Sequence, residues 1–275
     1  MGAFFRLSDG AEMFYRIDDF TDRWTTPTPV MFVHGFGESH EAWRGYVPHL
    51  ARRHRVIRID QRGFGASTPM AADFPWSMER WQGDLVEIIA ALAPAGVHLV
   101  AAKVGGPVAI AAAALRPDLV KSLTLIGTIV KGADHSATLA HIRELGLRSW
   151  LASTMKARLG SDMSDEATQW WLDLMSRTPV STALGFFAFV PSIDIMHHLG
   201  TLRCPVQVIA TDSERRPIGG TAAWQGLIPD SVLVPVGGAA YHAAAVLPDV
   251  CAALISAFVD RVDAGGGARQ VPSRP

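Results

Sequence analysis

Short apolar runs recur along the chain, and clusters of glycine, proline and charged residues separate them. Several runs are apolar at successive positions, so the strand that each would form is apolar on both faces. Strands of this kind are typical of parallel sheets that helices cover on both sides. We therefore expect a mostly parallel sheet. Its predicted strands cover residues 30–33, 55–59, 97–102, 122–126, 206–210 and 231–236.

Segments with helical periodicity alternate with these strands. Two shorter alternating runs, 4–7 and 12–17, flank the turn Ser8-Asp9-Gly10 and predict a β-hairpin at the start of the chain. Alternation of strands and helices favours a doubly wound α/β fold. The predicted helices cover residues 38–53, 77–92, 104–115 and 243–262.

The alternation stops after Thr128 and resumes near Leu202. We expect residues 131–198 to form an inserted helical lid over the carboxyl ends of the strands, where open α/β folds bind ligands. The sheet domain would then comprise residues 1–130 and 199–264, and residues 265–275, rich in Gly, Pro, Ser and Arg, would form a disordered tail. Aromatic side chains are concentrated in the predicted lid, at Trp150, Trp170, Trp171, Phe186, Phe187 and Phe189.

Composition narrows the classes of function. The 275 residues carry 25 Lys and Arg against 26 Asp and Glu, which offers no basic surface to nucleic acids or to anionic membranes. The longest apolar run, 107–115, is short of the roughly 18 residues that suggest a membrane span. Without a recognisable signal peptide, and with Cys204 and Cys251 interpreted as buried free thiols, we expect a soluble cytoplasmic protein. Its oligomeric state is not predicted.

The first predicted parallel strand ends in a glycine-flanked turn, His34-Gly35-Phe36-Gly37. Such a turn can direct backbone N–H groups toward one point. Together with Glu38 and Trp43, this stretch resembles the oxyanion loop of the α/β-hydrolase superfamily. The resemblance implies an α/β-hydrolase fold. The stretch from Asp60 to Ser67 is similar to the turn that follows that loop, and we interpret its polar residues, Asp60, Arg62 and Ser67, as turn-forming.

The resemblance continues at Ala101-Ala102-Lys103-Val104-Gly105-Gly106, which is similar to the family's nucleophile elbow. In the family this sharp turn exposes a serine nucleophile at the edge of the sheet. Here Lys103 stands in its place. By the same resemblance, we expect the oxyanion and substrate-binding residues to be His34, Gly35, Phe36, Glu38 and Val104.

Two further stretches are similar to the loops that hold the family's catalytic acid and histidine. The stretch Thr211-Asp212-Ser213-Glu214 assigns the acid to Glu214, with Asp212 as its rival. His242 matches the histidine, although Tyr241 precedes it where the family has glycine. The resemblance therefore implies a catalytic set of Lys103, His242 and Glu214.

A lysine at this point changes the chemistry, because an acyl group on lysine is an amide and does not hydrolyse as an acyl-serine does. Three hypotheses remain. His242, oriented by Glu214, could activate water while the Lys103 ammonium stabilises negative charge. Lys103 could lose its proton and form an imine with a carbonyl compound, for lyase or decarboxylase chemistry. The protein could also have lost catalysis and bind a small ligand.

The leading hypothesis is hydrolysis, or C–C or C–O cleavage, of a small, partly apolar carbonyl compound. The stretch from Asp18 to Trp24, followed by that from His34 to Ser39, resembles enol-lactone hydrolases and esterase-like members of the superfamily. The sequence contains no dinucleotide or phosphate-binding glycine motif, and His197-His198 has no partner at metal-ligand spacing, so we expect neither cofactor nor metal. An ammonium in a partly apolar site needs a counter-charge. Glu38 is the candidate for that charge, and its alternative role is that of a solvated carboxylate at a helix start.

Overall fold

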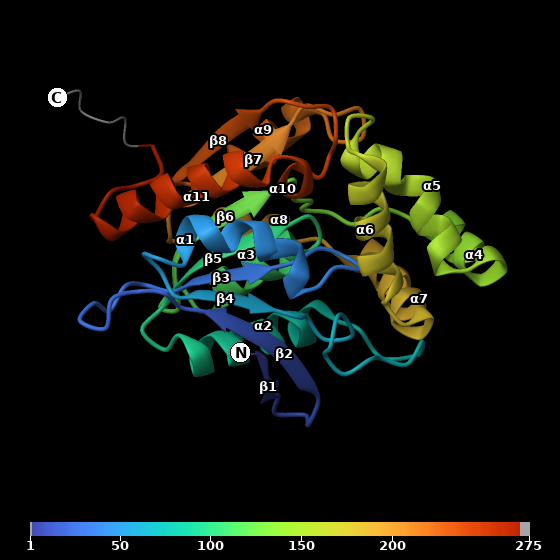
Figure 1. Cartoon of the computed structure of the whole chain (residues 1–275), viewed down its shortest axis with the longest axis horizontal. Coiled ribbons are helices and arrows are strands. Elements are labelled where there is room, and N and C mark those ends of the chain that lie inside the picture. Colours follow the sequence, from blue (N-terminus) through green and yellow to red (C-terminus); the bar gives the residue numbers. More distant parts are fainter. Residues whose placement is uncertain (1, 270–275) are drawn as a thin grey trace.

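An eight-stranded sheet forms the centre of the computed structural model, which describes residues 2–269 (Figure 1). The strand order is β1-β2-β4-β3-β5-β6-β7-β8. Strands β1 and β2 pair antiparallel as the predicted hairpin, β2 pairs antiparallel with β4, and all other pairs are parallel. The strands are β1 (Gly2–Arg6), β2 (Glu12–Asp18), β3 (Val30–Val33), β4 (Val56–Ile59), β5 (Val97–Ala102), β6 (Val120–Ile126), β7 (Val206–Thr211) and β8 (Ser231–Val236). The prediction of a mostly parallel sheet is confirmed.

Helices cover both faces of this sheet (Figure 1). On one face α11 (Pro248–Asp263) packs on Val30 and Phe32 of β3, and on the other face α2 (Met78–Leu92) and α3 (Gly105–Leu115) pack on Met31 and Val33. Because successive side chains of a strand point to opposite faces, a run of four buried apolar residues serves both layers. The continuous apolar runs of the sequence therefore follow from this two-sided covering.

Proline determines where two predicted helices divide. The segment predicted as one helix over 38–53 begins as a 3-10 helix, η1 (His40–Tyr46), and continues as α1 (Val47–Leu50), with Pro48 in the first turn. The segment 243–262 divides into α10 (Ala243–Val246) and α11, which begins at Pro248. Proline has no N–H to donate, so it is accommodated at the start of a helix and not within one.

The segment between β6 and β7 contains four longer helices, which lie together at one end of the sheet (Figure 1), and two short ones. Phe186 is fully buried, and its ring lies 5.7 Å from that of Phe36, in the loop after β3. The insertion therefore packs on the carboxyl end of a central strand. Its longer helices are α4 (Ser136–Leu145), α5 (Leu147–Leu159), α6 (Asp165–Ser176) and α7 (Val180–Phe189). The remaining short helices are η2 (Val190–Ser192), α8 (Met196–Leu199) and α9 (Ile218–Gln225).

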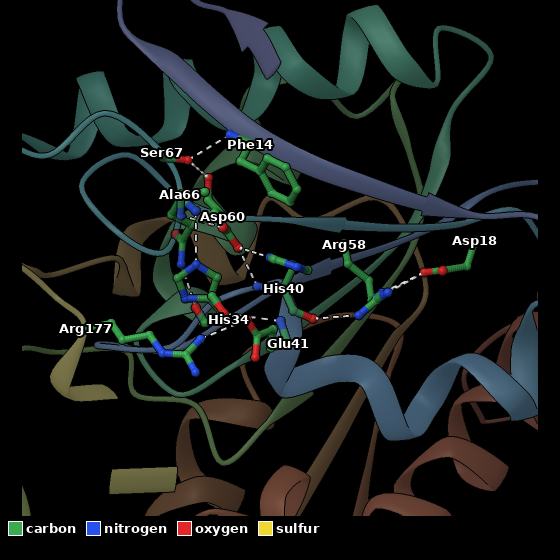
Figure 2. A network of polar contacts seen from close by, with 12 residues as sticks. Phe14, Asp18, His34, His40, Glu41, Arg58, Asp60, Ala66, Ser67 and Arg177 are labelled. Atoms are coloured by element: carbon green, nitrogen blue, oxygen red, sulfur yellow. Dashed lines mark hydrogen bonds and ion pairs between the residues drawn. The ribbon is translucent and has the colours of Figure 1, made fainter. Parts of the chain in front are cut away.

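The turn after β4 is held by a buried polar network (Figure 2). Asp60 is fully buried, and its carboxylate accepts from the ring of His40 (2.9 Å) and from the N–H of Ala66 (2.8 Å). The hydroxyl of Ser67 donates to the carbonyl of Asp60 at 2.6 Å and accepts from the N–H of Phe14 at 2.9 Å. These contacts confirm the turn-forming interpretation of Asp60 and Ser67.

Arg62 belongs to the same turn and forms a two-pronged ion pair with Asp84 of α2, at 2.6 and 2.7 Å. Both side chains are buried, so the pair fastens the turn to the helix layer. On β4, before this turn, Arg58 contacts Asp18 at 2.6 Å, as Figure 2 shows. Both buried arginines of this region therefore have a carboxylate beside them.

The prediction of a disordered tail from residue 265 is wrong for residues 265–269. Ala268 is 2% exposed and donates its N–H to Asp230 at 3.0 Å, and Arg269 donates to the carbonyl of Ser231 at 2.7 Å. These contacts fix the chain beside the start of β8. Residues 270–275 lie outside the described residues. Cys204 and Cys251 are buried free thiols, as predicted, and none of the helices within residues 2–269 is long and apolar enough to cross a membrane.

Candidate active site

Lys103 occupies the sharp turn between β5 and α3. Its φ of 52° makes it the only non-glycine residue with a positive φ within residues 2–269. A left-handed conformation costs an L-residue about 1–2 kcal/mol, so neighbouring structure must impose it. The N–H of Lys103 donates to the carbonyl of Ile126 on β6 at 3.0 Å, and its carbonyl accepts from Gly106 at 3.1 Å. The adjacent strand and the first turn of α3 thus hold the lysine at the edge of the sheet.

Two glycines, Gly35 and Gly105, allow close contacts at the turn that contains Lys103. A Cβ atom on Gly105 would lie 2.5 Å from the carbonyl oxygen of His34, so only glycine lets the turns after β3 and β5 approach this closely. A Cβ atom on Gly35 would lie 2.4 Å from Cε of Lys103. The side chain of Lys103 therefore lies across Gly35, toward the residues that follow it.

The amine of Lys103 contacts the buried carboxylate of Glu38. Oε1 of Glu38 contacts both Nζ of Lys103 and Nε2 of His242, the latter at 2.8 Å, and Oε2 accepts from the N–H of Gly35 at 2.9 Å. Glu38, Lys103 and His242 are 1%, 3% and 3% exposed. The structure therefore brings three of the predicted residues together, with Glu38 at their centre.

The electrostatics of this triplet favour an ion pair beside a neutral imidazole. Burial raises the pKa of Glu38, but the charge of Lys103 and the hydrogen bonds from Lys103 and His242 outweigh burial and hold that pKa well below its usual range. Burial lowers the pKa of Lys103 to about 8, against the attraction of Glu38. Burial and the charge of Lys103 lower the pKa of His242 to about 4. An ionised carboxylate only accepts hydrogen bonds, so Nε2 of His242 carries the ring's proton.

The predicted acid, Glu214, does not contact His242. Its side chain is exposed, and Nδ1 of His242 is buried without a hydrogen-bond partner in residues 2–269. The reason is a tight turn in which Ser213 and Arg216 pair through their backbones, which places Glu214 at the exposed tip. Asp212, the alternative acid, accepts from the N–H of Ile218 at 2.9 Å and is engaged at the start of α9.

A cavity of about 240 Å³ opens beside the lysine. Phe36, Lys103 and Val104 line it, and so do aromatic side chains of α5 and α7. The N–H groups of Phe36 and Val104 have no acceptor among the residues that the structure describes, so both are available to a ligand. The wall also includes Trp150, Arg158, Phe187, Arg215, Arg216 and Tyr241.

Two of the predicted site residues have other positions. His34 is fully buried and does not line the cavity; its Nδ1 lies 2.7 Å from the carbonyl of Gly35, and its Nε2 accepts from the N–H of Gln61 at 3.0 Å. It therefore ties the turn after β3 to the turn after β4 (Figure 2). His242 also lies outside the cavity wall, behind Glu38 and against the ring of Trp171, whose centre is 5.2 Å from that of the imidazole.

The sequence did not point to the arginines of the cavity wall. Arg158 lies within the predicted lid, where no motif marks it. Arg215 and Arg216 follow Glu214 directly. Two cations beside the expected acid are a sequence signal for positive charge at the site. Within residues 2–269, no group of three or more His, Cys, Asp or Glu side chains is arranged to hold a metal ion.

Comparisons with known proteins agree with this fold. Pimeloyl-(acyl-carrier protein) methyl ester esterase of Methylococcus capsulatus is 42% identical over 97 residues, so the match spans only 35% of this chain and 35% of that protein. (E)-2-((N-methylformamido)methylene)succinate hydrolase of Acinetobacter baylyi is 26% identical over 195 residues, covering 66% of this chain and 70% of that protein. The enol-lactonase of Burkholderia xenovorans has the same fold, with a TM-score of 0.83, 18% identity and coverage of 94% and 98% of the two chains.

A family model described as the alpha/beta hydrolase fold matches residues 28–244, which include the turn at Lys103, the inserted helices and His242. The match covers most of the chain. The protein therefore belongs to the α/β hydrolase fold family.

Proposed function

We propose that this protein is a hydrolase-like enzyme that cleaves a small, partly apolar carbonyl compound without an acylated serine. The bond would be that of an ester or a lactone, or a C–C or C–O bond. One observation carries the proposal: Lys103, which in sequence matches the family's nucleophile position, lines the cavity together with Phe36 and Val104, whose N–H groups have no acceptor among the described residues. A cation and N–H groups that converge in a water-poor site stabilise negative charge on a carbonyl oxygen.

The ion pair with Glu38 favours the charged form of Lys103. With a pKa of about 8, the lysine is charged in about ten molecules for each one in which it is neutral at pH 7. As an ammonium it would stabilise the negative charge that develops when water adds to a carbonyl or when a neighbouring bond breaks. It could also donate a proton to the leaving group, because a general acid works best with a pKa near the working pH.

Glu38 and His242 act through the lysine in this proposal, and we infer that they are positioning residues. The carboxylate beside His242 is that of Glu38 and not that of Glu214, and it contacts Nε2 and not Nδ1 of the ring. It directs Nζ of Lys103 and keeps its charge. His242 donates to the same carboxylate oxygen and fixes its orientation. Neither side chain lines the cavity, so neither is assigned a contact with substrate.

Imine formation is the second candidate, because burial brings the pKa of Lys103 down to about 8. Above that pH most molecules carry the neutral amine, which can attack a ketone or an aldehyde with loss of water. The two mechanisms make opposite demands on the lysine. Charge stabilisation and proton donation need the ammonium, whereas imine formation needs the amine.

Turnover of a panel of aryl esters, enol lactones and β-diketones by the wild type and by Lys103→Ala tests the proposal. We expect Lys103→Ala to lose about 100-fold to 1000-fold in kcat, the loss that follows removal of an oxyanion donor. Lys156→Ala, which removes an exposed lysine of α5, is the matched control. Equal turnover by Lys103→Ala and the wild type would refute the proposal, and a panel without turnover would favour the ligand-binding alternative.

Borohydride separates the two mechanisms. Incubation of the wild type with the ketones and aldehydes of the panel, followed by reduction and intact-mass measurement, detects an imine as a stable added mass. We expect no added mass at pH 7. An adduct that depends on Lys103 would replace the ammonium mechanism with the imine mechanism.

A further inference from the structure

Three guanidinium groups converge on one ring in the wall of the cavity. Arg158 comes from α5, and Arg215 and Arg216 come from the turn after β7. Their central carbons lie 5.9, 5.5 and 4.8 Å from the ring centre of Tyr241, and all four residues line the cavity. Two elements that are distant in sequence thus place positive charge at the same part of the wall.

These arginines have no carboxylate beside them. None of the three forms an ion pair within residues 2–269, although the other two cations of the wall do: Lys103 pairs with Glu38, and Lys131 pairs with Asp194 at 3.1 Å. The contacts of the arginines are to neutral groups. Nε of Arg158 donates to the hydroxyl of Thr154 at 3.0 Å, and Arg216 donates to the carbonyl of Gly127.

Other buried arginines of this protein do have carboxylate partners. Three arginines are buried in the described part of the chain, and two of them, Arg58 and Arg62, contact carboxylates at 2.6 Å. Arg158 is 7% exposed and has none. A buried charge without a partner is costly, and folding alone gives no reason to retain one. A missing negative charge is therefore expected from a ligand.

We propose that this cavity takes a substrate with a carboxylate group, which binds to Arg158 and Arg216 while the apolar part of the molecule lies against Phe36, Trp150 and Phe187. The proposal rests on the function proposed above, for the same cavity, and names the substrate class. A planar carboxylate suits the paired N–H groups of a guanidinium, and the aromatic side chains suit a short apolar or aromatic body. The carbonyl that reacts would then lie between this anchor and Lys103.

Calorimetric binding of 4-oxo-4-phenylbutanoate and of its neutral amide to the full-length wild type tests the proposal. We expect the acid to bind at least about tenfold more tightly than the amide, since a charged hydrogen-bonded pair is lost with the amide. The preference should shrink as NaCl is raised, because salt screens the attraction. Equal binding of acid and amide would overturn the proposal without any variant.

Variants of Arg158 and Arg216 test whether these two residues bind the carboxylate. Arg158→Gln and Arg216→Gln should each reduce the preference for the acid, and Arg158→Lys should retain part of it. Arg148→Gln is the matched control, because Arg148 lies on the same helix but is exposed and paired with Asp173 at 2.8 Å. Loss of the preference in the control, or its full retention in both cavity variants, would contradict the assignment. If one cavity variant does not fold, the other provides the same test.

Inorganic phosphate distinguishes the class of anion. Displacement of the acid by benzoate, with no displacement by phosphate at the same concentration, supports a carboxylate. Equally strong displacement by phosphate would overturn the carboxylate assignment. Binding needs no turnover, so the two proposals can fail separately: acid binding without any reaction refutes the function, and Lys103-dependent turnover of neutral esters without acid preference refutes the substrate class.

Discussion

Two buried polar regions of this protein differ in how completely their charges are satisfied. In the network around the turn after β4, Arg58 and Asp60 have charged or hydrogen-bonding partners within 3 Å (Figure 2), and so does Arg62. Beside the cavity, Nδ1 of His242 has no partner in the described residues, and Arg158 has no carboxylate. The first region surrounds the turn after β4, and the second is formed by α5 and by the turns after β3, β5 and β7.

The difference teaches where to look for function. A buried charge is tolerated in a fold when an opposite charge and hydrogen bonds satisfy it, as Asp84 satisfies Arg62. In the network after β4 both buried arginines, Arg58 and Arg62, have such a carboxylate beside them. Around the cavity, the N–H groups of Phe36 and Val104 and the guanidinium of Arg158 remain available. Unsatisfied donors that point into a cavity indicate a binding site.

The largest expected effect is the loss of stability when the buried ion pair between Arg62 and Asp84 is broken. Asp84→Ala removes the carboxylate beside buried Arg62 and should lower the free energy of unfolding by about 3 kcal/mol, the lower end of the range for breaking a buried pair, because Asp9 keeps a contact with Arg62 at 2.9 Å. Urea denaturation measures it. Asp118→Ala, which breaks an exposed pair with Arg116, should change stability by less than about 1 kcal/mol.

The corresponding substitution in the cavity, Arg158→Met, tests whether the two regions differ in their contribution to stability. Arg158→Met removes a buried charge that has no opposite charge to lose, so the free energy of unfolding should stay the same or rise. The same urea denaturation compares it with Asp84→Ala. A loss of stability by Arg158→Met as large as that by Asp84→Ala would show that both regions are structural, and the comparison would fail.

A smaller effect concerns pH. The pKa of His242 is lowered in the folded protein to about 4, so the unfolded chain binds the proton more readily, and stability falls as pH decreases from about 6.5 to 4. His242→Asn should reduce this dependence, with His34 and His98, whose pKa values burial also lowers, accounting for the rest. Thermal denaturation across this range measures it. His197→Asn, at an exposed position, should leave the dependence unchanged, and an unchanged slope in His242→Asn would contradict the buried neutral imidazole.

The smallest expected effect concerns Lys103→Ser, which should gain no esterase activity. Lys103→Ser places a serine in the turn that resembles the family's nucleophile elbow, but Nε2 of His242 is directed at Glu38 and no acid contacts Nδ1 in the described residues. We expect p-nitrophenyl acetate hydrolysis no faster than that of Lys103→Ala. A burst of p-nitrophenol from the serine variant would show instead that the site is a serine hydrolase silenced by one substitution.

Much of the fold was predictable because it depends on local patterns. Continuous apolar runs such as 30–33 identified strands covered on both faces, and the small residues around Lys103 identified the sharp turn. The boundaries that failed were set by single residues, as Pro248 divides one predicted helix into two. Residues 265–269 have a composition typical of disorder, but contacts with Asp230 and Ser231, which no local pattern reports, hold them in place.

The candidate site was less predictable, because its partners are set by how turns orient side chains. Glu214 matched the family's acid in sequence, yet the tight turn from Ser213 to Arg216 directs it to solvent. Glu38 could be anticipated from the need for a charge beside a buried lysine, but its contact with His242 could not. Arg158 reaches the cavity from an inserted helix, and sequence spacing carries no information on that approach.

The pH dependence of kcat/KM, measured between pH 6 and 10 for the wild type and Glu38→Gln, tests most directly whether Lys103 acts as an ammonium held by Glu38. The account predicts that wild-type activity falls as pH rises through about 8, where Lys103 loses its proton. Removal of the carboxylate removes the attraction that raises the pKa of Lys103, so the fall should move to lower pH in Glu38→Gln. Activity that rises through pH 8, or a profile that is the same in both proteins, would contradict the account.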